Sequence, residues 1–297
     1  YNSLNSLTDG TDNIAIGYQA AYNLGTSTFA NRNIAIGTYA LLSAANNNIN
    51  DNIAIGYGAL SQSVHSDGDN NVAIGTNAMS DLTAGAWGMV AVGDGALRRT
   101  NHADSAGSVA VGFSALGSNV SGIGNVAIGF DALKSEDDGD YNTAVGYEAL
   151  ENQTGVTGTV ANTALGYRAG KGVVKGTRNT YIGTESGLVA SASSAIDNVG
   201  VGAISLKAMV SGSSNTAVGT WAAQQMVNAS KTVAIGYYTL GNALTSTDID
   251  GSVAIGYTSQ AENRTGQGLT SVGFETLLVD VNGDFSTAIG YQALKTQ

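Results

Sequence analysis

The chain has 297 residues, with 41 glycines and neither cysteine nor proline, so disulfide scaffolds, thiol chemistry and thiolate metal sites are excluded. Only 12% of the residues are charged and the net charge is −11, which disfavours a nucleic-acid partner because affinity for a phosphate backbone comes from clustered Lys and Arg. No stretch approaches the roughly 20 apolar residues that a membrane-spanning helix needs, so we expect no membrane insertion. We interpret the acidity as a source of solubility for a surface-exposed assembly.

One phrase recurs from end to end: Asn-(Ile/Val/Thr)-Ala-(Ile/Val)-Gly-(Tyr/Phe/Thr)-x-Ala-Leu, as in NIAIGYGAL, NVAIGFDAL, NTAVGYEAL and STAIGYQAL. Successive central glycines are 17 to 20 residues apart, which leaves no room for an inserted domain. A β-branched run in so short a period predicts an all-β, parallel β-solenoid of sixteen coils, a single repeat array over residues 1–297 without a second domain. The sixteen central glycines are Gly17, Gly37, Gly56, Gly75, Gly93, Gly112, Gly129, Gly146, Gly166, Gly183, Gly202, Gly219, Gly236, Gly256, Gly273 and Gly290.

The first element of each repeat is a short strand that ends at the glycine, which we number position 0. Alternate strand residues point to opposite faces, so positions −3, −1 and +1 share one face and positions −4, −2 and 0 share the other. Position −1 is aliphatic in every copy, and we expect this column to be the most buried core. Its members are Ile16, Ile36, Ile55, Ile74, Val92, Val111, Ile128, Val145, Leu165, Ile182, Val201, Val218, Ile235, Ile255, Val272 and Ile289.

The opposite face carries alanine at −2 and the glycine, and it is also non-polar. A strand that is apolar on both faces is buried on both, so we expect the Ala/Gly face to meet another chain at close range in an obligate homo-oligomer. The glycine itself predicts a turn or a close approach of two backbones. Structural glycines by this criterion include Gly17, Gly37, Gly56, Gly75, Gly112, Gly129, Gly146, Gly256 and Gly290.

Position −4 is most often asparagine. Stacked asparagines can hydrogen-bond along a ladder, or each can cap the turn that enters its strand, and the sequence leaves both alternatives open. The members are Asn13, Asn33, Asn52, Asn71, Asn125, Asn142, Asn162, Asn179, Asn198 and Asn215.

After the glycine, an aromatic row predicts packing between coils, with a carbohydrate-stacking platform as the alternative. The Ala-Leu pair at +3 and +4 predicts either a second short strand or a single helical turn. The aromatic row consists of Tyr18, Tyr57, Phe113, Phe130, Tyr147, Tyr167, Tyr237, Tyr257, Phe274 and Tyr291.

An enzyme needs converging groups in a pocket. The two histidines, His65 and His102, lie in different inter-strand segments without a carboxylate and nucleophile at a recognisable spacing. The carboxylates at Glu136, Asp137, Asp138 and Asp140 crowd one turn, whereas glycosidic cleavage needs two carboxyls set apart across a cleft. We therefore interpret them as a solvated loop, expect no catalytic residues and do not expect an enzyme.

The only candidate for ion binding is the turn with Asp280, Asn282 and Asp284. Oxygen ligands at alternate positions are how a calcium loop begins. Phe285 stands where such a loop needs glycine, and Tyr291 occupies the position of its bidentate glutamate. We expect weak calcium binding at best, with a plain acidic turn as the alternative. No other cofactor is expected.

The segments GSVAIGY at 251–257, SVAVGFSAL at 108–116 and NNVAIGT at 70–76 resemble the head repeats of trimeric autotransporter adhesins. The NTAVGYEAL form is equally similar to repeats in marine phage tail-fibre and other structural proteins. This resemblance covers essentially the whole chain and implies a left-handed parallel β-roll, with three chains packed around a common axis. The coils are longer than in the adhesins, and no neck motif, stalk heptads or membrane anchor is recognisable, which favours the phage alternative.

The resemblance implies a structural shaft or fibre segment of a virion, with the adhesin head of a bacterial surface protein as the alternative. Partners would be two further copies of the chain, other virion or surface-appendage proteins, and a host-surface glycan or protein bound through the variable turns. The location would be extracellular, on a virion or a bacterial cell surface. A polysaccharide depolymerase is a remote alternative. An ice-binding solenoid is equally remote, since Thr does not recur in regular paired columns on an outward face.

Overall fold

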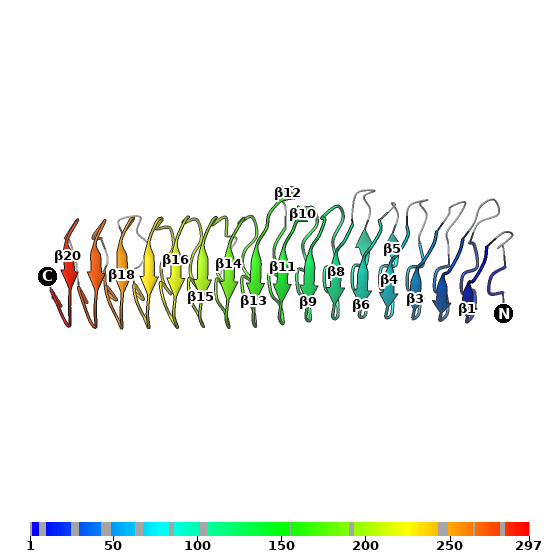
Figure 1. The fold of residues 1–297 in the computed structure, drawn as a ribbon, viewed down its shortest axis with the longest axis horizontal. Helices are drawn as coiled ribbons and strands as arrows, with labels where there is room; N and C mark the ends of the chain where they lie inside the picture. Colours follow the sequence, from blue (N-terminus) through cyan, green and yellow to red (C-terminus); the bar gives the residue numbers. More distant parts are fainter. Residues whose placement is uncertain are drawn as a thin grey trace. The chain divides into compact units, whose positions relative to one another are not determined.

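The structure, a computed structural model, describes residues 2–5, 10–24, 30–42, 49–62, 68–82, 86–100, 106–154, 156–189, 193–242, 249–263, 265–279 and 283–296. These residues form short strands and turns and contain no helix. The chain divides into two compact units, Tyr1–Tyr147 with Thr154–Val160, and Glu148–Gln153 with Ala161–Gln297, which we call unit 1 and unit 2. In each unit every strand pairs in parallel with the strand of the next coil (Figure 1). The predicted all-β parallel β-solenoid is therefore confirmed.

Unit 1 stacks eight three-residue strands in register, so that each alanine pairs with the alanine of the next coil, for example Ala15 with Ala35. Two pairs of two-residue strands, β5 with β7 and β10 with β12, add to the turns. The eight strands are β1 (Ile14–Ile16), β2 (Ile34–Ile36), β3 (Ile53–Ile55), β4 (Val72–Ile74), β6 (Val90–Val92), β8 (Val109–Val111), β9 (Val126–Ile128) and β11 (Thr143–Val145). The short pairs are β5 (Asp81–Leu82), β7 (Arg99–Thr100), β10 (Gly139–Asp140) and β12 (Gly158–Thr159).

Unit 2 repeats this arrangement with eight further strands. The sixteen three-residue strands exceed the number of complete turns, which is about 13. The predicted count of sixteen coils is thus slightly too high. That residues 1–297 form one uninterrupted array stays a prediction. The strands are β13 (Thr163–Leu165), β14 (Thr180–Ile182), β15 (Val199–Val201), β16 (Thr216–Val218), β17 (Val233–Ile235), β18 (Val253–Ile255), β19 (Thr270–Val272) and β20 (Thr287–Ile289).

The connections between strands turn sharply because the backbone enters the left-handed region at positions −5, +2 and +4. In the coil of β9, Asp131 has φ 53° and Leu133 has φ 49°, and Tyr141 before β11 has φ 60°. The Ala-Leu segment is therefore neither a strand nor a right-handed helical turn, since both need negative φ. It is a tight turn, closed by a 3.4 Å hydrogen bond from the amide of Ala132 to the carbonyl of Gly129.

The core of each coil is a narrow interior filled by small and medium side chains. Alanine at −2 points inward from the strand, and the Ala-Leu pair at +3 and +4 points inward from the turn. In one coil Ala127, Ala132 and Leu133 all have no exposed surface. Interiors pack at near-crystalline density, so the alanine leaves the space that the leucine fills.

The expected burial of the −1 column is wrong within a single chain. Ile16 is 61% exposed, Leu165 47% and Ile289 70%, whereas the alanine between the two aliphatic residues of a strand is buried in most coils. The physical reason is the alternation along the strand: the −2 side chain points into the coil, so the −3 and −1 side chains point outward. The Ala/Gly face thus packs against the chain's own turn, not against another chain. Exposed members are Ile16, Ile74, Ile128, Leu165, Val218, Ile235 and Ile289, and partly exposed members are Ile36, Ile55, Val92, Val111, Val145, Ile182, Val201, Ile255 and Val272.

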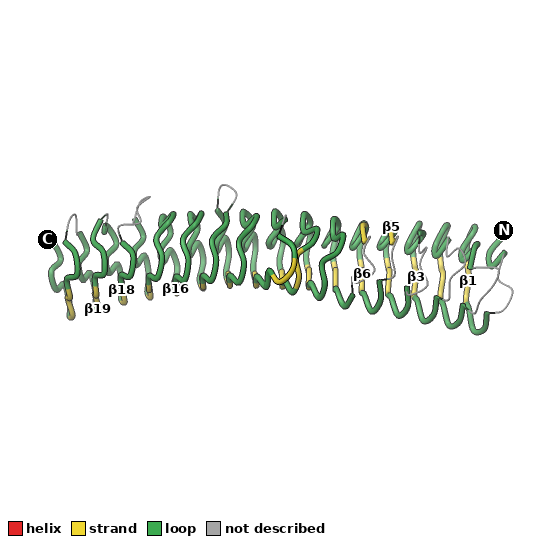
Figure 2. The backbone as a smooth tube through the Cα atoms, turned by 90° about the horizontal axis from the view of Figure 1, so that it is seen from above, coloured by secondary structure: helices red, strands yellow, loops and turns green. Residues whose placement is uncertain are grey.

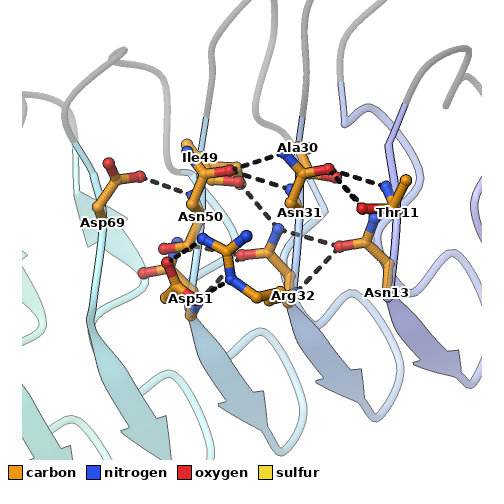
Figure 3. Close-up of polar contacts among 11 residues, drawn as sticks. Thr11, Asn13, Ala30, Asn31, Arg32, Ile49, Asn50, Asp51 and Asp69 are labelled. Atoms are coloured by element: carbon orange, nitrogen blue, oxygen red, sulfur yellow. Dashed lines mark hydrogen bonds and ion pairs between the residues drawn. The ribbon is translucent and has the colours of Figure 1, made fainter.

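The asparagines at −4 both form a ladder and fasten the turns. The Oδ1 atom of Asn33 accepts hydrogen bonds from the backbone amide and from Nδ2 of Asn52, at 3.1 and 3.2 Å. The Nδ2 atom of Asn33 also donates to the carbonyl of Ile49 at 2.9 Å, in the turn before the next strand. Figure 3 shows this network around Asn13 and its neighbours. Because these amides are buried, their hydrogen bonds satisfy groups that water cannot reach.

The central glycines are required on two independent grounds. Gly202 has φ +125°, and a Cβ built on it would lie 2.6 Å from the carbonyl oxygen of Gly219 in the next coil. Any other residue would therefore be strained in its backbone and would clash with a neighbouring backbone that cannot move aside.

Replacing Gly202 by alanine should lower the free energy of unfolding by roughly 3 kcal/mol or more, because backbone strain alone costs about 1–3 kcal/mol. Gly251 is the matched control, since it has φ +72° and no atom lies within 4 Å of the point that a Cβ would occupy. Gly251→Ala should cost only about 1 kcal/mol. Chemical denaturation of the two variants measures both values, and equal losses would contradict the close-approach explanation.

Candidate functional site

The most extensive exposed feature is a row of aliphatic side chains on the outer face of the strands, which we call the aliphatic stripe. It consists of the residue at −1 of each strand, together with the residue at −3 where that residue is aliphatic, such as Val233 and Ile235 in β17; in six strands position −3 is threonine. Ile128 and Ile235 are 39% and 38% exposed. The strands of each unit follow one another along one side of the coils (Figure 2), so the stripe runs without interruption through a unit. An apolar strip of this kind marks an interaction surface.

Aromatic rings at +1 lie beside the stripe and stack along it. In unit 1 the ring centroids of Phe113 and Phe130 are 5.2 Å apart with an interplanar angle of 11°. In unit 2 the rings of Tyr237, Tyr257 and Phe274 follow one another at 5.2 and 5.1 Å, each tilted by only 7° from the next. Because neighbouring rings cover both faces of each inner ring, the inner rings expose only their edges. The ladders therefore do not fit a platform on which sugars stack, and they favour packing between coils.

The acidic turn at residues 136–140 is not the uniformly solvated loop that we expected. Glu136 has no exposed surface, and its Oε1 accepts hydrogen bonds from the amides of Gly139 at 2.8 Å and Asp137 at 3.0 Å. Its Oε2 accepts a 3.3 Å hydrogen bond from Nδ2 of Asn142. Burial raises the pKa of Glu136 to about 7, and the nearby charge of Asp137 adds to this, against the opposing effect of the backbone hydrogen bonds.

The remaining acids of this turn are partly buried and hold neighbouring segments. Asp138 accepts a hydrogen bond from the hydroxyl of Ser121 at 2.6 Å, and Asp140 accepts one from the amide of Ile123 at 2.9 Å. These carboxylates bind the preceding coil and are not set as a pair across a cleft. The geometry gives no support to a depolymerase at this turn.

Only part of the calcium candidate lies within the described residues, since Asp280 and Asn282 fall outside them. The third member, Asp284, accepts a 2.9 Å hydrogen bond from the backbone amide of Gln267. Asp69 and Asp250 occupy the same position, −6. Each also accepts a hydrogen bond from a backbone amide of the preceding coil, at 2.6 and 2.7 Å. A structural role therefore accounts for Asp284, and calcium binding stays a prediction.

No group of three or more His, Asp or Glu in the described ranges could hold a metal ion. His65 and His102 lie outside these ranges. Nor does any helix in the described part of the chain have the length and apolar character to cross a membrane.

One surface hollow in unit 1, lined by Arg98, Gly117 and Lys134 among others, was not predicted from the sequence. The signal was present in the repeat register, because a glycine falls between two basic residues at the same position of three successive repeats. That position varies too much between repeats to attract attention by itself.

Replacing Glu136 by glutamine should remove one pH-dependent loss of stability. The pKa of Glu136 in the fold, about 7, lies above the ordinary value of 4.5. The neutral acid therefore stabilises the fold fully below about pH 4.5, and this contribution is lost as the pH rises through 7. Glutamine, which stands at the equivalent position as buried Gln153, stays neutral.

Glu136→Gln should therefore match the natural protein near pH 4 and exceed its free energy of unfolding at pH 8 by up to about 3 kcal/mol. Unfolding curves recorded between these pH values test this. Parallel pH profiles for the two proteins would show that Glu136 does not titrate as a buried acid.

The chain was compared with protein-family models, with curated proteins and with solved structures. None of them matches it. What the protein does is therefore inferred from its own surfaces: the aliphatic stripe, the aromatic ladders and the hollow beside Gly117.

Proposed function

We propose that this protein is a structural shaft segment of an extracellular fibre, formed by three identical chains that pack along the aliphatic stripe. The observation that carries the proposal is the exposure of this stripe over every strand of both units. The repeat supplies a scaffold of uniform coils, and the described residues offer no constellation of catalytic groups. A left-handed β-roll, as in the families that the sequence resembles, is the form that we infer.

The energetics favour chain association through this face. Fully burying an aliphatic side chain stabilises by about 1.5–3 kcal/mol, and the members of the stripe are partly buried to different degrees in the single chain. Gains on the order of 1 kcal/mol per side chain, repeated over the coils of a unit, sum to on the order of 10 kcal/mol. That is enough to hold chains together despite the entropy lost on association. The contact face thus differs from the Ala/Gly face that the sequence suggested, while the expected homotrimer is retained.

A virion fibre is the setting we favour, since the coils are longer than in the adhesin heads that the sequence resembles and the NTAVGYEAL form resembles repeats of phage structural proteins. The partners would then be other virion proteins, and the role would be mechanical. The adhesin head of a bacterial surface protein remains the second candidate, because the same stripe would serve either assembly. Any further domain encoded in the same gene would distinguish them: a virion-attachment domain supports the first and a membrane-anchor barrel the second.

Sedimentation of the purified chain should show a trimer, and Ile235→Asp should convert it to monomer or weaken the trimer at least about 100-fold, since a charge buried among aliphatic side chains costs several kcal/mol. Ile235 is 38% exposed in the single chain, so the variant should remain folded, as circular dichroism will show.

Ser211→Asp is the control, because it adds the same charge to an exposed position of unit 2 away from the stripe. It should leave the trimer intact. A stable, folded monomer of the natural chain would refute the proposal, and an Ile235→Asp variant that stays trimeric would show that the chains meet elsewhere.

A further inference from the structure

A surface hollow of about 180 Å³ crosses three successive coils of unit 1 and is lined by Gly95, Arg98, Ser114, Gly117, Ser118 and Lys134. We call it the Gly117 notch. Arg98, Gly117 and Lys134 each stand five residues after a central glycine, so they form one column. The notch exists because the middle member of this column has no side chain between two long basic ones.

The space above Gly117 is bordered by backbone, not filled by a neighbour. A Cβ on this residue would have as its nearest atoms the carbonyl oxygens of Ser114 at 3.1 Å and Gly95 at 3.6 Å. Gly241 stands at the same position in unit 2, but there the ring of Tyr238 lies 2.8 Å from the equivalent point. The point that a Cβ would occupy is thus bordered by backbone at Gly117 and covered by a side chain at Gly241.

The charge at the notch contrasts with the rest of the protein. The chain carries a net charge of −11, and most of its basic side chains are bound to carboxylates. Arg98 is exposed and forms no ion pair with any residue that the structure describes. Lys134 is held by Asp131 at 2.9 Å, which positions an ammonium group that still has donors to spare. The basic residues in ion pairs are Arg32, Lys134, Arg168, Lys171, Arg178, Lys207 and Lys295.

We infer that the Gly117 notch binds a negatively charged sugar residue, such as a uronic acid. Arg98 and Lys134, whose backbones are about 10 Å apart at two coil spacings, flank the gap, and their charged groups can bind a carboxylate by charge-assisted hydrogen bonds. The carbonyls of Gly95 and Ser114 accept hydrogen bonds from sugar hydroxyls, and the hydroxyls of Ser114 and Ser118 can donate or accept. A simple anion would use only the cations and not these oxygen atoms.

The size of the notch suits one sugar unit of a longer chain. Its volume of about 180 Å³ is below the roughly 300–1,000 Å³ of sites that enclose drug-sized ligands. The lining residues lie two, five and six positions after the central glycine, in and after the left-handed bend, whereas the aliphatic stripe precedes the glycine. The notch therefore uses none of the stripe residues through which we propose that the chains associate.

Saturation-transfer difference titrations on the full chain test the inference with glucuronate as the probe. Glucuronate should bind saturably, and both glucose, which lacks the charge, and acetate, which lacks the hydroxyls, should bind about tenfold more weakly or not at all. Absence of saturable glucuronate binding would overturn the inference. Equal binding of acetate would also overturn it, because the notch would then be a site for a plain anion.

Two variants locate the binding. Arg98→Ala removes one cation, and Gly117→Leu fills the gap with a side chain that already stands at this position as Leu188. Both should weaken glucuronate binding about tenfold or more. Arg99→Ala is the control, since it removes the same charge from the neighbouring residue, which does not line the notch; it should bind as the natural chain does. If Arg98→Ala and Arg99→Ala weaken binding equally, the effect is general charge, and the site is wrong.

Discussion

Successive coils approach so closely at the central glycines that no side chain fits between them. This contact fixes the spacing at which the strands pair, the register in which alanine meets alanine, and the distance over which the asparagine ladder can bond. Every other column of side chains inherits that spacing, from the stacked rings of Tyr237 and Tyr257 to the carboxylates that bind the preceding coil. The fold is therefore a consequence of one backbone contact repeated at each turn.

The repeat predicted the strands and the glycines because both depend on local chemistry. A β-branched run predicts a strand wherever it occurs. The central position adopts φ near +130°, which favours glycine, so a glycine recurs at the same position of every repeat and marks the turn. The sidedness of the strand was mispredicted, because alternation says which residues share a face but not which face is inside. The direction in which the chain turns after the strand decides that, and it depends on left-handed residues such as Leu133, whose conformation leucine does not signal.

The candidate sites also divide into features that the local sequence predicts and features that depend on the assembled coils. The acidic turn was recognisable as a cluster, but nothing in its sequence distinguishes Glu136 from Asp138, although only the first is fully buried. The Gly117 notch depends on three residues separated by 19 and 17 positions in the chain. Such a site can be recognised only when the repeats are aligned so that equivalent positions of successive coils lie together. Each of its residues by itself occupies a position that tolerates many residue types.

The asparagine ladder gives each unit a direction. In both units Oδ1 of one asparagine accepts hydrogen bonds from the next asparagine toward the C-terminus, as Asn179 does from Asn198 and Asn198 from Asn215. The side-chain dipoles are thus aligned head to tail. The two faces that would close such a stack are chemically unlike, one offering amide donors and the other carbonyl acceptors. A stack of these coils is consequently polar, and it could be extended only by a unit added in the same orientation.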